Sequence, residues 1–218
     1  MDLGECVHDV FRVLGSSHLM AGGLYTIIES RPMTPPQNAT SPQTKVITLG
    51  GGCFWCTEAV FVRVNGVLDV ESGYTNGHVS NPSYAQVCEG NTGHNEVVRL
   101  VYDPQVISLR ELLEIFFVIH DPTTLNRQGN DAGTQYRSGI YLSDEADRWV
   151  AQGVIDEVNA VLSGRVVTEL TMLSNYSAAE AYHQDYFEHH PAQGYCAFVV
   201  APKVQKFVQT FADKVKYV

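Results

Sequence analysis

The sequence is short of basic residues and of long apolar runs. Lys and Arg together number 14 against 24 Asp and Glu, a formal net charge of −10, and no basic cluster interrupts this balance. Nucleic acid and anionic membranes are therefore poor partners. No apolar stretch approaches the roughly 20 residues of a membrane-spanning helix, and residues 1–5 lack the basic opening of a signal peptide. We expect a cytoplasmic protein without a membrane partner.

Cysteine is also scarce. Five cysteines in 218 residues are too few and too unevenly spread for a disulfide scaffold. In a reducing compartment the default expectation is buried free thiols, Cys88 among them, with reactivity reserved for a thiol in an electropositive, accessible place. Cys53 and Cys56 stand three residues apart, directly after three glycines. This spacing fits a redox pair, half of a zinc site or two structural thiols.

The zinc interpretation lacks ligands. Cys6, Cys88 and Cys196 occur singly, without the paired spacing of a second zinc knuckle. His183, together with the histidines at 189 and 190, is more simply part of a partly exposed helix end. We therefore expect no metal.

The chain divides near residue 45. Residues 1–44 contain a short apolar-periodic piece and an irregular, proline-containing polar stretch, 33–42, and are predicted to be an N-terminal extension. Residues 45–218 are predicted to be one domain. Its pattern predicts strands at 45–49, 67–73, 97–102 and 138–142, and helices at 59–64, 108–120 and 144–162. Ser108 and Glu111 are placed for a capping box.

The order of these elements is that of a split βαβ unit. The predicted fold class is α/β (α+β): a ferredoxin-like two-layer sandwich with a mixed sheet and helices on one face. Long loops and a C-terminal extension, with helical or mixed pieces at 178–189 and 202–217, add to this core.

Cys53 is the better candidate for a reactive thiol. It leaves a strand through glycines and opens a helix, where free backbone N–H groups and the positive end of the helix dipole favour a thiolate. Cys56 lies one helical turn later, on the same face, and so within reach for disulfide exchange.

Three polar stretches elsewhere in the chain indicate a functional site. Residues 72–84, 90–96 and 120–138 are rich in glycine, amide and hydroxyl groups that neither strands nor helices require. Loops of this kind on a compact scaffold commonly build a functional site.

Several motifs in these stretches, in this order, resemble the peptide methionine sulfoxide reductases of the A type. The resemblance covers about residues 45–197. The matching pieces are Gly52-Cys53-Phe54-Trp55 with Glu58, Ser72-Gly73-Tyr74, Pro82-Ser83-Tyr84, Thr92-Gly93-His94-Asn95-Glu96, Tyr102-Asp103-Pro104, the run 120–138, Tyr182-His183-Gln184-Asp185-Tyr186 and Gly194-Tyr195-Cys196. The resemblance implies that residues 45–218 are a catalytic domain. It also implies thiol-dependent reduction of the S epimer of methionine sulfoxide, in proteins and as the free amino acid, without a cofactor.

The resemblance also implies roles for individual residues. Cys53 attacks the sulfoxide sulfur and becomes a sulfenic acid. Glu96 is the acid for the sulfoxide oxygen, which Tyr84 and Tyr136 hydrogen-bond. For Glu96 to hold a proton near pH 7, its pKa must be raised by a desolvated, apolar site.

Other residues support the substrate or regenerate the enzyme. Phe54 and Trp55 cradle the substrate's methyl group, and Asp131 is a polar support, acting through a water. Cys56, where many relatives have glycine, and Cys196 are both candidates for the resolving thiol, leading to a disulfide that thioredoxin reduces.

Two other functions fit parts of the pattern. A general thiol–disulfide oxidoreductase would use Cys53 and Cys56 as its redox pair. A methionine- or peptide-binding module would use the aromatic pair without turnover.

Overall fold

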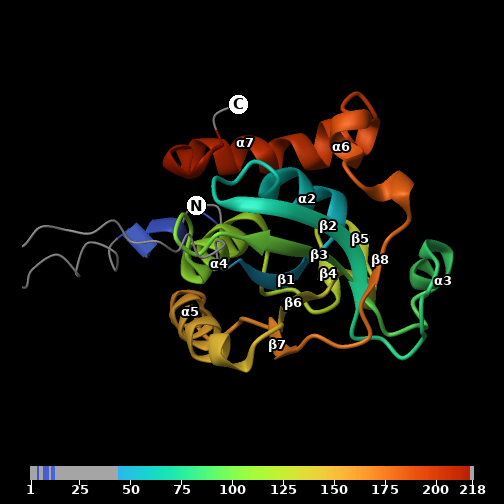
Figure 1. Cartoon of the computed structure of the whole chain (residues 1–218), viewed down its shortest axis with the longest axis horizontal. Coiled ribbons are helices and arrows are strands. Elements are labelled where there is room, and N and C mark those ends of the chain that lie inside the picture. Colours follow the sequence, from blue (N-terminus) through green and yellow to red (C-terminus); the bar gives the residue numbers. More distant parts are fainter. Residues whose placement is uncertain (1–3, 5–6, 10, 13–43, 217–218) are drawn as a thin grey trace, which may run out of the picture.

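A six-stranded sheet forms the centre of the computed structural model, which describes residues 4, 7–9, 11–12 and 44–216. The strand order is β7-β6-β1-β3-β2-β8 (Figure 1). A separate two-stranded ribbon pairs β4 with β5. The bounds are β1 Lys45–Gly51, β2 Val67–Thr75, β3 Asn95–Tyr102, β4 Arg127–Gln128, β5 Asp131–Ala132, β6 Ser138–Leu142, β7 Glu169–Met172 and β8 Ser177–Ala178.

The four middle strands have ferredoxin-like topology. β6, β1, β3 and β2 lie side by side and each neighbouring pair is antiparallel. β8 adds an antiparallel edge beside β2, and β7 adds a parallel edge beside β6. The predicted mixed sheet with a split βαβ core is confirmed.

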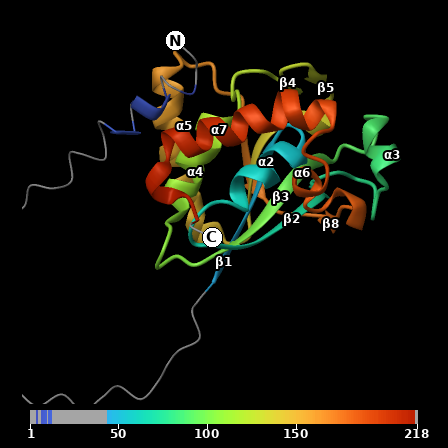
Figure 2. The same ribbon diagram turned by 90° about the horizontal axis from the view of Figure 1, so that it is seen from above.

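Helices α2 and α4 are the two crossover helices of this unit. α2 packs on β1, β2 and β3, α4 contacts β1, and α5 contacts both α4 and β7. α7 lies over α2 and α4, as Figures 1 and 2 show from two directions. The bounds are α2 Phe54–Phe61, α3 Tyr84–Cys88, α4 Leu109–Ile119, α5 Arg148–Val161, α6 Tyr186–His189 and α7 Ala201–Thr210.

The start of α4 is fixed locally. Ser108 Oγ accepts a hydrogen bond from Glu111 N–H at 3.2 Å, and the Glu111 carboxylate accepts one from Ser108 N–H at 2.8 Å. This reciprocal pair satisfies two backbone groups that the first turn leaves without partners. The predicted capping box is confirmed.

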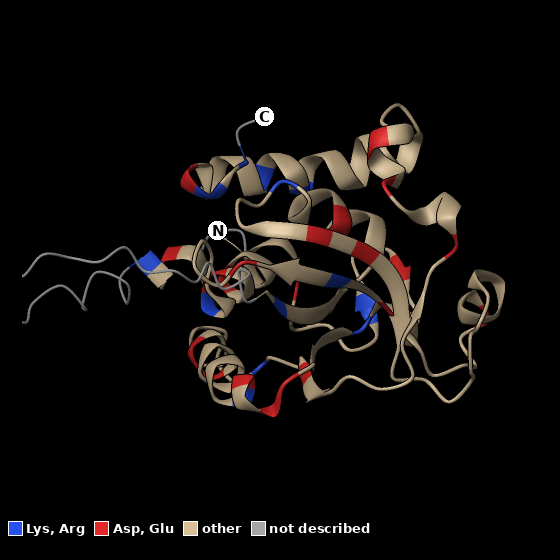
Figure 3. Cartoon of the chain, in the orientation of Figure 1, with Lys and Arg blue, Asp and Glu red and all other residues tan. Residues whose placement is uncertain are grey.

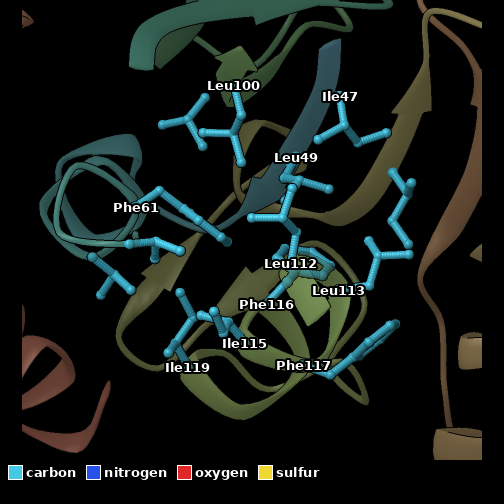
Figure 4. Packing of buried hydrophobic residues seen from close by; sticks show 14 of the residues in the cluster. Ile47, Leu49, Phe61, Leu100, Leu112, Leu113, Ile115, Phe116, Phe117 and Ile119 are labelled. Carbon is cyan, nitrogen blue, oxygen red and sulfur yellow. The ribbon is translucent and has the colours of Figure 1, made fainter. Parts of the chain in front are cut away.

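The core lies between the sheet and the two crossover helices. Figure 4 shows side chains of the sheet meeting those of α2 and α4 in one apolar layer. Six of them, all 1% exposed or less, are Ile47, Leu49, Leu100, Phe61, Leu112 and Phe116. Full burial of each such side chain is worth about 1.5–3 kcal/mol relative to leaving it in water. This layer therefore fixes α2 on the sheet, and the residues at its first turn with it.

Charged residues of both signs are dispersed over the elements, with acidic positions along β2 (Figure 3). Among the described residues, no helix is long and apolar enough to cross a membrane.

Two of the described residues before residue 13 contribute to the core. Residues 4, 7–9 and 11–12 are helical, with Val7 and Phe11 buried. The Arg110 guanidinium lies 6.0 Å from the centre of the Phe11 ring. The predicted irregular stretch 33–42 is outside the described residues, and the domain boundary near residue 45 stays a prediction.

Candidate active site

Cys53 sits where the strand β1 turns into the helix α2. The turn passes through Gly52, whose φ of +91° favours glycine, and a Cβ there would lie 2.6 Å from Cγ of Gln128. Cys53 takes the N-cap position of α2 and is 8% exposed. The strand–glycine–helix setting predicted for Cys53 is therefore confirmed.

The electrostatics of Cys53 differ from the expectation. Its side chain caps no backbone N–H of α2; instead, Phe54 N–H donates to Oε2 of Glu96 at 3.2 Å. Burial raises the pKa of the Cys53 thiol well above its ordinary value, and its hydrogen bond to Cys56 and the charge of Glu96 act in the same direction. The expectation of an accessible Cys53, stabilised as a thiolate by the helix start, was wrong, because Glu96 accepts the first amide of the helix and the thiol is buried.

Cys56 is the more readily ionised thiol of the pair. The hydrogen bond from the Cys53 thiol, opposed by burial, lowers the pKa of Cys56 to about 7. Cys53 therefore keeps its proton to a higher pH than Cys56 does.

Glu96 provides an acid at the same place. It lies on β3, is 1% exposed, and its pKa is raised to about 8 by burial. The charges of Asp131 and Cys56 act in the same direction, while the Phe54 N–H bond opposes them. At pH 7 the carboxyl is mostly protonated and can act as a proton donor.

Cys53 and Glu96 line the same cavity, which has a volume of about 270 Å³. Every residue predicted to be catalytic or to bind substrate lines it: Cys53, Phe54, Trp55, Tyr84, Glu96, Asp131 and Tyr136. Gln193 and Tyr195, to which the sequence assigned no role, line it as well. The Gly194-Tyr195-Cys196 match was the available signal for Tyr195.

Asp131 is held by Tyr195. The Tyr195 hydroxyl donates to Oδ2 of Asp131 at 2.6 Å and lies 4.0 Å from Sγ of Cys56. A tyrosine from the C-terminal part of the chain thus bridges the carboxylate and the thiol pair.

Tyr84 and Tyr136 reach the cavity from two different loops. Tyr84 opens α3 after the N-cap Ser83, and Tyr136 ends the 3₁₀ turn Thr134–Tyr136. Burial raises the pKa of both hydroxyls, so both stay protonated and can donate hydrogen bonds. Cys88 is exposed, not buried as expected, because Val87 is the buried residue of this short outer helix.

The aromatic wall depends on a second segment. The Tyr186 ring stacks on Trp55 with a centroid distance of 3.8 Å and an interplanar angle of 6°. Trp55 Nε1–H donates to Nδ1 of His183 at 3.2 Å. His183 is 2% exposed, so the expected partly exposed helix end was wrong at this residue. It lies in the 3₁₀ turn Ala181–His183, inside the aromatic cluster.

The two candidate resolving thiols lie outside the cavity lining. Cys56 and Cys196 are 1% and 0% exposed, and both are free thiols. Cys196 begins the π-helical turn Cys196–Val200, and its N–H donates to Oε1 of Gln193 at 3.1 Å. Burial and the charge of Cys56 raise the pKa of Cys196. Among the described residues, no group of three or more His, Cys, Asp or Glu is arranged to hold a metal ion.

A thiol beside a protonated carboxyl, with a second thiol next to it and an aromatic wall, defines the site of a thiol-dependent oxidoreductase. Comparison with known proteins gives the family. The family model for peptide methionine sulfoxide reductase matches residues 45–215. A peptide methionine sulfoxide reductase MsrA of Saccharolobus solfataricus is 55% identical over 79% of this chain and 97% of its own length.

Solved structures of methionine sulfoxide reductases are also similar to this chain. Reduced Mxr1 of Saccharomyces cerevisiae has a TM-score of 0.68 and 39% identity, covering 73% of this chain and 92% of its own. Methionine sulfoxide reductase A of Corynebacterium diphtheriae has a TM-score of 0.65 and 38% identity, covering 72% and 80%. The chain belongs to the peptide methionine sulfoxide reductases and is an oxidoreductase that reduces methionine sulfoxide with thiols.

Proposed function

We propose that this protein reduces the S epimer of methionine sulfoxide, in proteins and as the free amino acid, and so repairs oxidative damage in the cytoplasm. The observation that carries the proposal is the buried Glu96, with a pKa of about 8, in the same cavity as Cys53. A sulfoxide oxygen is a poor leaving group until it is protonated. A carboxyl that keeps its proton at pH 7 supplies what this chemistry needs.

In the first step, the Cys53 sulfur attacks the sulfoxide sulfur while Glu96 gives its proton to the oxygen. The Cys53 proton passes to Cys56, the thiol of the pair with the lower pKa. The new bond between the two sulfurs and the sulfur–oxygen bond of the substrate then both break. The oxygen, carrying the proton from Glu96, bonds to the Cys53 sulfur. Methionine leaves and Cys53 remains as a sulfenic acid, so the substrate is reduced and Cys53 oxidised.

Four cavity residues assist this step. Tyr84 and Tyr136 donate hydrogen bonds to the sulfoxide oxygen, in keeping with their raised pKa values. Phe54 and Trp55 surround the methyl group of the substrate.

Asp131 contributes indirectly. Its hydrogen bond with Tyr195 supports a role as a polar brace for the site.

The sulfenic acid is then resolved by a thiol, with release of water and formation of a disulfide. Cys56 is the first resolving thiol and Cys196 the second, in a relay that ends with reduction by thioredoxin. Cys56 is one helical turn from Cys53, and the charge of Cys56 acts on Cys196, which supports this order.

Turnover of the two sulfoxide epimers tests the proposal. Each epimer of a blocked methionine sulfoxide is incubated with the protein and dithiothreitol, and methionine is quantified. We expect product from the S epimer alone, none with Cys53→Ser, and retained turnover in the matched control Cys88→Ser. Equal turnover of the R epimer contradicts the stereochemistry. Reduction of insulin disulfides without any sulfoxide turnover supports a general disulfide oxidoreductase instead.

A further inference from the structure

Trp55, one wall of the cavity, is held from two sides by the segment 181–190. Tyr186 covers its ring face and His183 accepts its indole N–H. Glu58 anchors this segment, since its carboxylate accepts hydrogen bonds from Tyr186 N–H at 3.3 Å and from Ser72 Oγ at 3.1 Å. The position of Trp55 therefore depends on residues far away in the sequence.

The hydrogen bond from Trp55 fixes the protonation state of His183. An indole N–H is only a donor, so Nδ1 of His183 must be the unprotonated, accepting nitrogen. The single proton of the neutral ring is then on Nε2, which is buried without a hydrogen-bond partner. A second proton, on Nδ1, would set a donor against the indole N–H and break the contact.

The surroundings of His183 favour the neutral ring. From α2, Phe54 and Trp55 face it with ring-centre distances of 5.1 and 5.6 Å, and Tyr84 of α3 lies at 4.4 Å. From its own turn, Tyr182 lies at 4.3 Å.

The charged group nearest to His183 Nε2 is Glu180, with Oε2 at 4.0 Å. This carboxylate already accepts hydrogen bonds from the Tyr74 hydroxyl and from Tyr84 N–H. Burial lowers the pKa of His183, and the charge of Glu180 only partly opposes this.

We propose that His183 is a positioning residue that holds Trp55 in the substrate cavity only as the neutral imidazole, so that its protonation weakens binding of methionine sulfoxide. The inference rests on the proposed function, in which Trp55 contacts the substrate's methyl group. His183 does not touch the reacting atoms in this scheme. Its loss therefore raises the half-saturating substrate concentration and leaves the maximal rate of the first turnover unchanged.

Trp55 itself can report the state of His183. The chain has two tryptophans, and Trp149 is 85% exposed and does not line the cavity. In a Trp149→Phe background, which should keep wild-type turnover, tryptophan emission comes from Trp55 alone. Emission is recorded from pH 5 to pH 8, and first-turnover rates are measured without reductant over a range of substrate concentrations.

Two variants separate the acceptor from the ring. His183→Asn keeps an acceptor oxygen but does not titrate in this range, while His183→Phe keeps a ring without an acceptor. In the background protein we expect one emission transition with a midpoint below pH 6.5, and a rise of about tenfold in half-saturating substrate across it. His183→Asn should show neither change. His183→Phe should show the tenfold rise at every pH.

The results that would contradict the inference can be told apart from those that would contradict the proposed function. A transition with its midpoint below pH 6.5 that persists in His183→Asn assigns this titration to another group and overturns the inference. Wild-type half-saturation in His183→Phe, with normal turnover, overturns the positioning role while the proposed function stands. An enzyme with no turnover in any form overturns the proposed function and the inference together. If His183→Phe fails to fold, as judged by circular dichroism, the Asn variant still decides.

Discussion

Replacing Glu96 with glutamine should separate the chemistry of its proton from its place in the fold. Glutamine has nearly the same size, and its carbonyl oxygen can still accept the Phe54 N–H that Glu96 accepts at 3.2 Å. The amide has no acidic proton to give to a sulfoxide oxygen. If general acid catalysis contributes its usual share, we expect the first-turnover rate to fall by about 10²–10⁴-fold.

The same replacement should change how stability depends on pH. The pKa of Glu96 is raised from 4.5 to about 8 in the folded protein, so between these values the folded state binds more protons than the unfolded state. Stability contributed by this group is then lost as pH rises from 4.5 to 8. At 1.36 kcal/mol for each pKa unit, the loss is about 5 kcal/mol.

The measurement is urea unfolding of wild type and Glu96→Gln at pH 5, 7 and 9 under reducing conditions. Glu58, whose pKa is raised to about 7, is present in both proteins, so its effect cancels in the difference. We expect the variant to gain stability relative to wild type as pH rises, with the largest gain at pH 9. Wild-type activity should decline above pH 8, as Glu96 ionises.

Two results would refute this reasoning. A stability difference that does not change from pH 5 to pH 9 means that Glu96 does not titrate with a raised pKa. A first-turnover rate within tenfold of wild type means that Glu96 is not the acid. Either result would remove the observation on which the proposed function depends.

Three further predictions concern other parts of the molecule. Cys56→Ser and Cys196→Ser should each still form one methionine per enzyme without reductant. If both variants lose steady-state turnover with thioredoxin, and mass spectrometry maps the corresponding disulfides, the relay is supported. Full turnover in Cys196→Ser contradicts the relay. Tyr136→Phe should lower the first-turnover rate by about three- to tenfold, the net worth of one hydrogen bond, and an unchanged rate argues against contact with the oxygen. Ser108→Ala should lower the free energy of unfolding by about 1 kcal/mol through loss of the α4 cap. Urea unfolding measures this change, and unchanged activity is its control. An unchanged free energy of unfolding would contradict the cap's contribution.

Much of the fold follows from short-range patterns. The glycines before Cys53 and the apolar periodicity after it predict a strand that turns into a helix, and Ser108 with Glu111 predicts where α4 begins. These features depend on backbone conformation and on contacts within one or two turns, which the local sequence fully specifies. The residues of the cavity were found by resemblance, since nothing local brings Tyr84, Asp131 and Tyr136 together.

The proton chemistry depends on contacts between distant segments. The local pattern assigned the helix-start amides to the Cys53 thiolate, whereas the fold gives the first of them to Glu96, 42 residues away in sequence. Burial of Cys53 then raises its pKa, whereas the pKa of Cys56 is lowered by the hydrogen bond from Cys53.

Burial and exposure elsewhere follow from the same long-range packing. His183 is buried because the segment 181–190 folds back on Trp55, and Cys88 is exposed because α3 lies outside the core. Local patterns in the sequence thus predicted the scaffold and singled out Cys53 as the candidate nucleophile. The direction in which each pKa shifts follows from the folded chain instead, because desolvation and the distances between charges are set by packing between segments far apart in the sequence.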